Sequence, residues 1–136
     1  MDTREALLFL RDHHRGVLAT YRQDGRVQMS PVVAAVDSDL RVVISTREPA
    51  IKTRNLRRDP RAGLVVFPDQ FFGPWVMLWG QAEVVSLPAA MPLLEEYYRL
   101  VSGEHPDWEE YRSAMVAERR VLVRLTVTEY GPRRSG

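Results

Sequence analysis

Hydrophobic residues recur along this chain with two different periods, which divide it into short strands and helices. Apolar runs rich in β-branched residues and bounded by turn residues predict strands, whereas apolar residues three and four positions apart predict amphipathic helices. The predicted strands are 16–21, 27–36, 40–45, 62–67, 75–87 and 121–127. The predicted helices are 3–13, 49–58, 88–102 and 107–119.

Tight turns join the first three predicted strands. Asp24-Gly25 between two apolar runs is a strong hairpin signal, and the polar segment 37–39 predicts a second turn. Strands that follow one another through tight turns pair antiparallel. Six strands with few long crossovers therefore predict a mainly β domain, either a small barrel or a sandwich, with the helices packed outside.

Four residues mark expected irregularities and helix starts. Pro31 lacks a backbone donor, so its strand should be at a sheet edge or carry a bulge there. Gly80 predicts a bulge in the long strand. Thr3 and Thr46 are the expected N-caps of the first two helices.

Length and composition limit the class of protein. With 136 residues the chain is expected to form one domain, 1–136, in which 130–136 is a polar, mobile tail. The first residues lack the pattern of a signal peptide, and no apolar run is long enough to span a membrane. Zero cysteines exclude disulfides and thiolate chemistry and fit a cytoplasmic location. A net charge of +1 argues against general nucleic-acid binding.

Charge changes this picture in one segment. Of the 19 basic residues only Lys52 is a lysine. The segment from Arg47 to Arg61 contains six basic and two acidic residues, a local net charge of +4 in a chain of net charge +1. A near-neutral protein with one concentrated basic segment is expected to bind an anion there.

The residue types in this segment suit phosphate. Ser45 and Thr46 supply hydroxyl groups where a strand ends, and Lys52 and Arg54 supply charge on the next helix. Lysine acts as a compact point charge and arginine as a bidentate fork. A solvated helix face is the alternative reading, but it leaves the like charges of Arg54 and Arg58 unexplained.

Other chemistry has little support in the sequence. His13, His14 and His105 are the only imidazoles, and they form no metal-ligand pattern, so surface or capping roles are expected. No nucleophile elbow, P-loop or dinucleotide fingerprint occurs. Phe71 and Phe72 lie in a predicted loop, where exposed aromatic rings would indicate an interface.

The order of residues resembles the pyridoxamine-phosphate-oxidase-like split-barrel family. Within it, the chain is similar to small dimeric deazaflavin (coenzyme F420)-dependent oxidoreductases of the B type. The resemblance covers nearly the whole chain, and its most specific part is the basic segment. The matching segments are 16–20, 24–26 with Gln28 and Ser30, Glu48-Pro49, 52–62, 103–105, 107–108, 111–112, 115–116 and 119–122.

The resemblance implies a six-stranded, FMN-binding-type split β-barrel that forms a homodimer with a cofactor at the subunit interface. The cofactor ring would lie near Gln28, Met29, Ser30 and Val32. Its phosphate would meet Ser45, Thr46, Lys52, Arg54 and Asn55. The other subunit would cover the ring with Trp75 and Val76.

The function implied by the resemblance is hydride transfer from reduced F420 to an unsaturated small organic substrate, with no nucleic-acid or membrane partner. Two positions depart from the pattern, since Ala50 replaces a common arginine and Pro31 a common asparagine. The choice between F420 and FMN therefore stays open. An FMN-binding oxidase or reductase is one alternative, and a non-catalytic flavin- or haem-binding module is another. The sequence identifies no catalytic residue.

Overall fold

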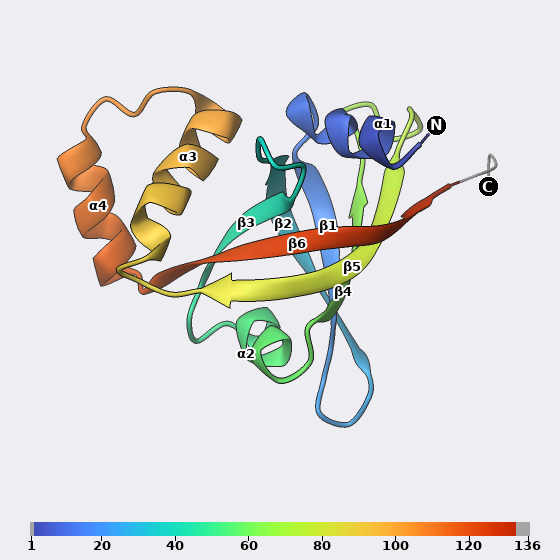
Figure 1. Ribbon diagram of the computed structural model, residues 1–136, viewed down its shortest axis with the longest axis horizontal. Helices are drawn as coiled ribbons and strands as arrows, with labels where there is room; N and C mark the ends of the chain where they lie inside the picture. Colours follow the sequence, from blue (N-terminus) through green and yellow to red (C-terminus); the bar gives the residue numbers. More distant parts are fainter. Residues whose placement is uncertain (1, 133–136) are drawn as a thin grey trace.

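Six antiparallel strands close into a barrel in the computed structural model, which describes residues 2–132 (Figure 1). The strand order around the barrel is β1-β2-β3-β6-β5-β4. The strands are β1 (Arg15–Tyr21), β2 (Val27–Val36), β3 (Val42–Arg47), β4 (Arg61–Val66), β5 (Val76–Val85) and β6 (Arg120–Gly131). The helices are α1 (Thr3–Leu8), α2 (Ile51–Arg58), α3 (Ala90–Ser102) and α4 (Trp108–Ala117), and a 3₁₀ turn, Phe9–Arg11, follows α1. The barrel prediction is confirmed.

Aliphatic side chains fill the barrel. Leu64 on β4 lies opposite Leu78 on β5, and both are buried. Helix α1 packs Ala6 and Leu7 against the same core, and the 3₁₀ turn after it packs Leu10 there. Each such leucine contributes about 1.5–3 kcal/mol through burial, so this core fixes the barrel on which the outer elements rest.

Helices α3 and α4 stand side by side next to the barrel (Figure 1). Leu94, Tyr111 and Met115 from these helices share a second buried cluster with Ala35, Val43 and Leu122 from the strands. The helix pair is therefore held by its own apolar contacts, and it supplies a second wall beside the outer surface of the sheet.

Strand β2 has a free edge along most of its length. Its first part, Val27–Val33, pairs with β1 and has no β3 partner, and its last part, Ala34–Val36, pairs with β3. Pro31 lies in the part without a β3 partner, which confirms the predicted edge position. Because β2 and β3 separate here, the sheet opens toward α3 and α4.

The predicted bulge at Gly80 is also confirmed. The register between β5 and β6 shifts between Trp79 and Gly80. Trp79 pairs with Glu129 and Gly80 with Val127, so Thr128 of β6 is the extra residue of the bulge.

Both expected N-caps were wrong. Asp2 caps α1, since its carboxylate accepts the Glu5 N–H at 2.8 Å, and Thr3 is the first helical residue. Thr46 is a buried residue of β3, and α2 begins only after Ala50. Tertiary pairing decides this, because β3 continues through Arg47 by pairing with β6.

Several element boundaries also differ from the predictions. The third strand begins at Val42 because Leu40 adopts the left-handed conformation (φ 59°) in the preceding turn. The last strand continues to Gly131, so Tyr130 and Gly131 belong to β6 rather than to a tail. The remainder of the predicted tail, 133–136, lies outside the described residues. Among residues 2–132, no helix has the length and hydropathy needed to cross a bilayer.

Candidate functional site

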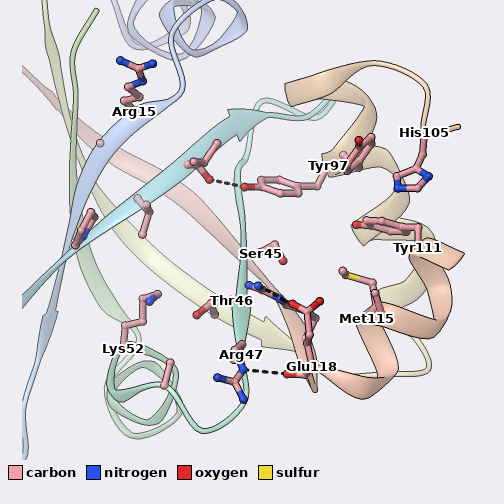
Figure 2. A pocket seen from close by; sticks show the side chains of 18 of the residues that line it. Arg15, Ser45, Thr46, Arg47, Lys52, Tyr97, His105, Tyr111, Met115 and Glu118 are labelled. Atoms are coloured by element: carbon pink, nitrogen blue, oxygen red, sulfur yellow. Dashed lines mark hydrogen bonds and ion pairs between the residues drawn. The ribbon is translucent and has the colours of Figure 1, made fainter. Parts of the chain in front are cut away.

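A cavity of about 950 Å³ lies between the barrel and the helix pair α3–α4 (Figure 2). Strands β1 to β3 form one wall, and α3, α4 and the start of β6 form the other. The volume is within the range of small-molecule sites, about 300–1,000 Å³. The lining residues used below are Arg15, Val17, Pro31, Val32, Val33, Ser45, Thr46, Arg47, Lys52, Tyr97, Tyr98, His105, Tyr111, Met115, Glu118 and Arg120.

Helix α2 carries Lys52 to one end of this cavity. The Thr53 hydroxyl donates a 2.7 Å hydrogen bond to the Arg47 carbonyl, which ties the helix to the end of β3. Buried Asn55 donates to the Thr20 hydroxyl of β1 at 3.1 Å. A buried polar group is costly to leave unpaired, so these contacts fix the orientation of α2 and hence the position of Lys52.

Several cations of the basic segment are already engaged. Arg57 forms an ion pair with Glu48 at 2.6 Å, and Arg61 forms one with Asp59 at 2.7 Å, which lowers the Asp59 pKa to about 2. Arg58 donates to the Tyr21 carbonyl at 2.7 Å. These arginines therefore belong to the scaffold and carry little of the anion-binding potential that the sequence suggested.

Lys52 is different. Within residues 2–132 its ammonium group has no hydrogen bond or ion pair, although the side chain is partly buried and lines the cavity. Burial lowers the pKa of Lys52, and the nearby Arg120 cation lowers it further. A partly desolvated cation beside a second cation would be stabilised by a bound anion.

The other charged groups of the lining leave this end positive. Arg120 is paired with Glu118 at 2.8 Å, and Arg15 with Asp69 at 3.1 Å. Arg47 donates only to the neutral carbonyl of Glu118, at 3.2 Å. Lys52 and Arg47 are therefore the lining cations without a carboxylate partner in the described part of the chain.

Two hydroxyl groups stand beside this charge. Ser45 and Thr46 line the cavity between Lys52 and the helix pair (Figure 2). Neither side-chain hydroxyl hydrogen-bonds to another residue within 2–132. We name Ser45, Thr46, Arg47 and Lys52 the cationic end of the cavity.

The structure brings together four of the predicted site residues: Val32, Ser45, Thr46 and Lys52 all line the cavity. Arg54 is exposed and does not line it, and it has no ion pair with a described residue. Buried Asn55 also does not line it and serves the scaffold through its bond to Thr20.

The remaining predicted residues do not line the cavity of a single subunit. The Gln28 side chain accepts a hydrogen bond from Arg22 at 3.3 Å, Met29 is exposed, and Ser30 is half-buried. Trp75 is half-buried, whereas the Val76 side chain is fully buried inside the barrel. Because the whole residue is buried, Val76 offers no exposed surface to a ring bound by a partner subunit.

The opposite end of the cavity was missed by sequence reasoning. Tyr97, Tyr98, His105 and Tyr111 line it, and we name these four residues the aromatic end. The sequence predicts a surface or capping role for His105, whereas the structure places its half-buried ring 4.9 Å from the ring of Tyr98. In the sequence, the available signal for this end was the occurrence of four ring-bearing residues on the two predicted helices and the connection between them.

Two tyrosines of the aromatic end use their hydroxyl protons within the fold. Tyr97 donates to the Val33 carbonyl and Tyr111 to the Leu94 carbonyl, each at 2.7 Å. Burial raises the pKa of both phenols, that of Tyr111 to about 12. These hydroxyls are therefore neutral structural donors. Within residues 2–132, no cluster of His, Asp and Glu side chains could hold a metal ion.

The chain is thus a closed six-stranded antiparallel barrel with a cavity between its strands and two outer helices. The family model described as pyridoxamine 5'-phosphate oxidase matches residues 3–133, and the chain belongs to this family.

Solved structures share the fold at low sequence identity. A conserved hypothetical protein from Mycobacterium tuberculosis is 24% identical with a TM-score of 0.78, over 100% of this chain and 92% of that one. An F420 reductase is 22% identical with a TM-score of 0.67, over 90% and 92% of the two chains. A heme binding protein from Mycobacterium smegmatis is 21% identical with a TM-score of 0.71, over 94% of this chain and 52% of that one.

Proposed function

We propose that this protein is an F420-dependent oxidoreductase that reduces an unsaturated small organic substrate. The observation that carries the proposal is the Lys52 ammonium group, which is partly buried at the cationic end of the cavity without a counter-ion among the described residues. The family membership of the chain supports the redox class.

The residues present fit a phosphate-bearing flavin-type cofactor. Lys52 and Arg47 would supply charge to the phosphate, and the hydroxyl groups of Ser45 and Thr46 would donate hydrogen bonds to it. Val17, Val32 and Val33 form an apolar wall of the cavity against which a ring could lie. Bound F420 supplies hydride transfer, while the protein holds the ring, neutralises its anionic groups and excludes water.

The choice of F420 over FMN rests on Arg54. This side chain is exposed on α2, two residues from Lys52, and forms no ion pair with a residue in 2–132. F420 has several carboxylates on its tail, and a cation beyond the phosphate position would suit them. FMN lacks these carboxylates and would leave Arg54 without a role.

Titration of purified protein with F420 tests the cofactor. We expect quenching of F420 fluorescence that saturates at one cofactor per subunit and is displaced poorly by FMN. A protein that purifies yellow with flavin bands and ignores F420 would favour the FMN alternative. A haem Soret band would favour a haem-binding module, the alternative for which the heme binding protein of the same fold is the precedent.

We further propose that the protein is a homodimer in which the second copy covers the free edge of β2. Val27, Met29 and Val33 are exposed apolar residues on the part of β2 that pairs only with β1. Phe71 and Phe72 are also exposed, by 71% and 93%, as the loop prediction required. Exposed apolar residues gathered on a strand with one unpaired edge indicate a contact surface.

Sedimentation velocity at micromolar concentration tests the assembly. We expect a single species of twice the 15.7 kDa chain mass. Met29→Glu should shift this species toward the monomer, because a carboxylate buried in an apolar contact is costly. A wild-type protein that sediments as a monomer would remove the proposed two-subunit site.

A further inference from the structure

The aromatic end of the cavity is built as a rigid unit that the cofactor proposal leaves without a ligand. The rings of Tyr98 and Tyr111 lie 5.2 Å apart, and His105 lies 5.5 Å from Tyr111. Trp108 supports the group, at 5.7 Å from His105 and 5.4 Å from Tyr111. Tilted and edge-on aromatic contacts at these distances are favourable, so the rings hold one another in place.

Within residues 2–132, the hydrogen bonds of this cluster leave His105 and Tyr98 as its uncommitted groups, and His105 carries the donor argued below. Its Nδ1 atom accepts the Asp107 N–H at 2.9 Å, so the proton of the neutral ring is on Nε2. Because Tyr97 and Tyr111 use their protons on backbone carbonyls, they have none to offer a ligand. Among the described residues nothing accepts from His105 Nε2.

The opposite wall of the cavity is aliphatic. Val17, Pro31, Val32 and Val33 line it from β1 and β2. Lys52 and His105 lie on opposite sides of the cavity (Figure 2). A ligand between the aromatic end and the aliphatic wall therefore meets apolar surface and a hydrogen-bond donor on the side of the cavity away from the cationic end. Glu110 of α4 also lines the cavity and would disfavour an anionic ligand there.

We propose that the aromatic end is a substrate subsite for a planar conjugated ring that bears a carbonyl group, and that His105 Nε2–H donates a hydrogen bond to the carbonyl oxygen. The two ends differ in the charge of the ligand they select: the cationic end selects an anionic group, and the aromatic end an uncharged ring. As an assignment of the reducible substrate, the inference rests on the proposed function. As a binding site for such rings, it can be tested independently of it.

Two bicyclic probes of similar size separate the hydrogen bond from ring packing. Coumarin has a ring carbonyl, and naphthalene has none. Both are titrated into the purified protein without F420, and the indole N–H signal of Trp108 is followed by nuclear magnetic resonance. The signals of Trp75 and Trp79 serve as controls, because they lie on and before β5 rather than in the aromatic cluster.

We expect His105→Phe to weaken coumarin binding by about five- to tenfold, since it keeps an aromatic ring but removes the donor. Naphthalene affinity should stay within about twofold, which also shows that the cluster has kept its shape. In the wild-type protein, coumarin and not naphthalene should shift the ¹⁵N resonance of His105 Nε2.

Equal coumarin affinity in wild type and His105→Phe would overturn the inference. So would a loss of affinity confined to Tyr98→Phe, which would assign the donor to the other uncommitted group of this end. Lys52→Ala separates the two proposals. If it weakens F420 binding while coumarin binding still depends on His105, both stand. If F420 never binds but the coumarin effect is found, the cofactor proposal alone fails.

Discussion

Replacing Lys52 with alanine is expected to weaken F420 binding by about 1.5–3 kcal/mol, roughly 10- to 150-fold, as judged by fluorescence titration. The ammonium group lines the cationic end and has no ion pair with another residue in 2–132, so its whole charge is available to a phosphate. Stability should change little, because no contact that holds the barrel is removed. An unchanged affinity would refute the assignment of Lys52.

Two further variants sharpen this test. Arg54→Ala removes the cation proposed to meet the tail carboxylates, but from an exposed position outside the cavity, so it should cost less affinity than Lys52→Ala, about 0–1 kcal/mol. Lys52→Arg keeps a charge that does not titrate. Burial and Arg120 lower the pKa of Lys52, so this side chain loses its charge at a lower pH than an ordinary lysine does. As the pH is raised, wild-type affinity for F420 should therefore begin to fall earlier than it would with an ordinary lysine. This loss should be absent in Lys52→Arg.

Replacing Gly80 with alanine is expected to destabilise the protein by about 2–3 kcal/mol and to lower its melting temperature by roughly 10 °C. A Cβ atom at this position would lie 2.8 Å from the Thr126 carbonyl carbon, closer still to its oxygen, and 3.0 Å from Val127 Cα. These are backbone atoms of β6 and cannot turn aside. The strand would have to move at the bulge that joins it to β5.

Calorimetry on Gln81→Ala provides the matched control. Gln81 is the next residue of β5, is exposed, and should change stability by no more than about 0.5 kcal/mol. Because Gly80 lies outside the cavity lining, F420 affinity of the folded Gly80→Ala protein should be close to wild type. A melting temperature equal to that of Gln81→Ala would show that β6 accommodates the methyl group without cost.

The basic segment shows how far composition leads. The excess of arginine around Lys52 indicated an anion site, and the structure does place Lys52 beside Ser45 and Thr46. Yet Arg57 and Arg61 form ion pairs with Glu48 and Asp59, and a count of charges could not reveal these pairs. Local charge identifies a segment, whereas the geometry of ion pairs decides which members of it remain available.

The sequence by itself determined the presence of the six strands, the hairpins and the bulge at Gly80, and it limited Pro31 to a sheet edge or a bulge. Each of these depends on local chemistry: periodicity, turn residues, a missing N–H or a missing side chain. The family resemblance added the closed barrel, which the pattern alone could not separate from a sandwich. Lys52 could be identified from the sequence because it is the single lysine among 19 basic residues.

Only the tertiary structure decided the cavity and its second end. Tyr97 and Tyr98 of α3, His105 of the connection and Tyr111 of α4 meet because the helix pair packs on the outer surface of β2, β3 and β6. Strand pairing with β6 likewise kept Thr46 in β3 rather than at a helix start. Contacts between residues far apart in the chain leave no periodic trace, so the site chemistry they create becomes visible only in the fold.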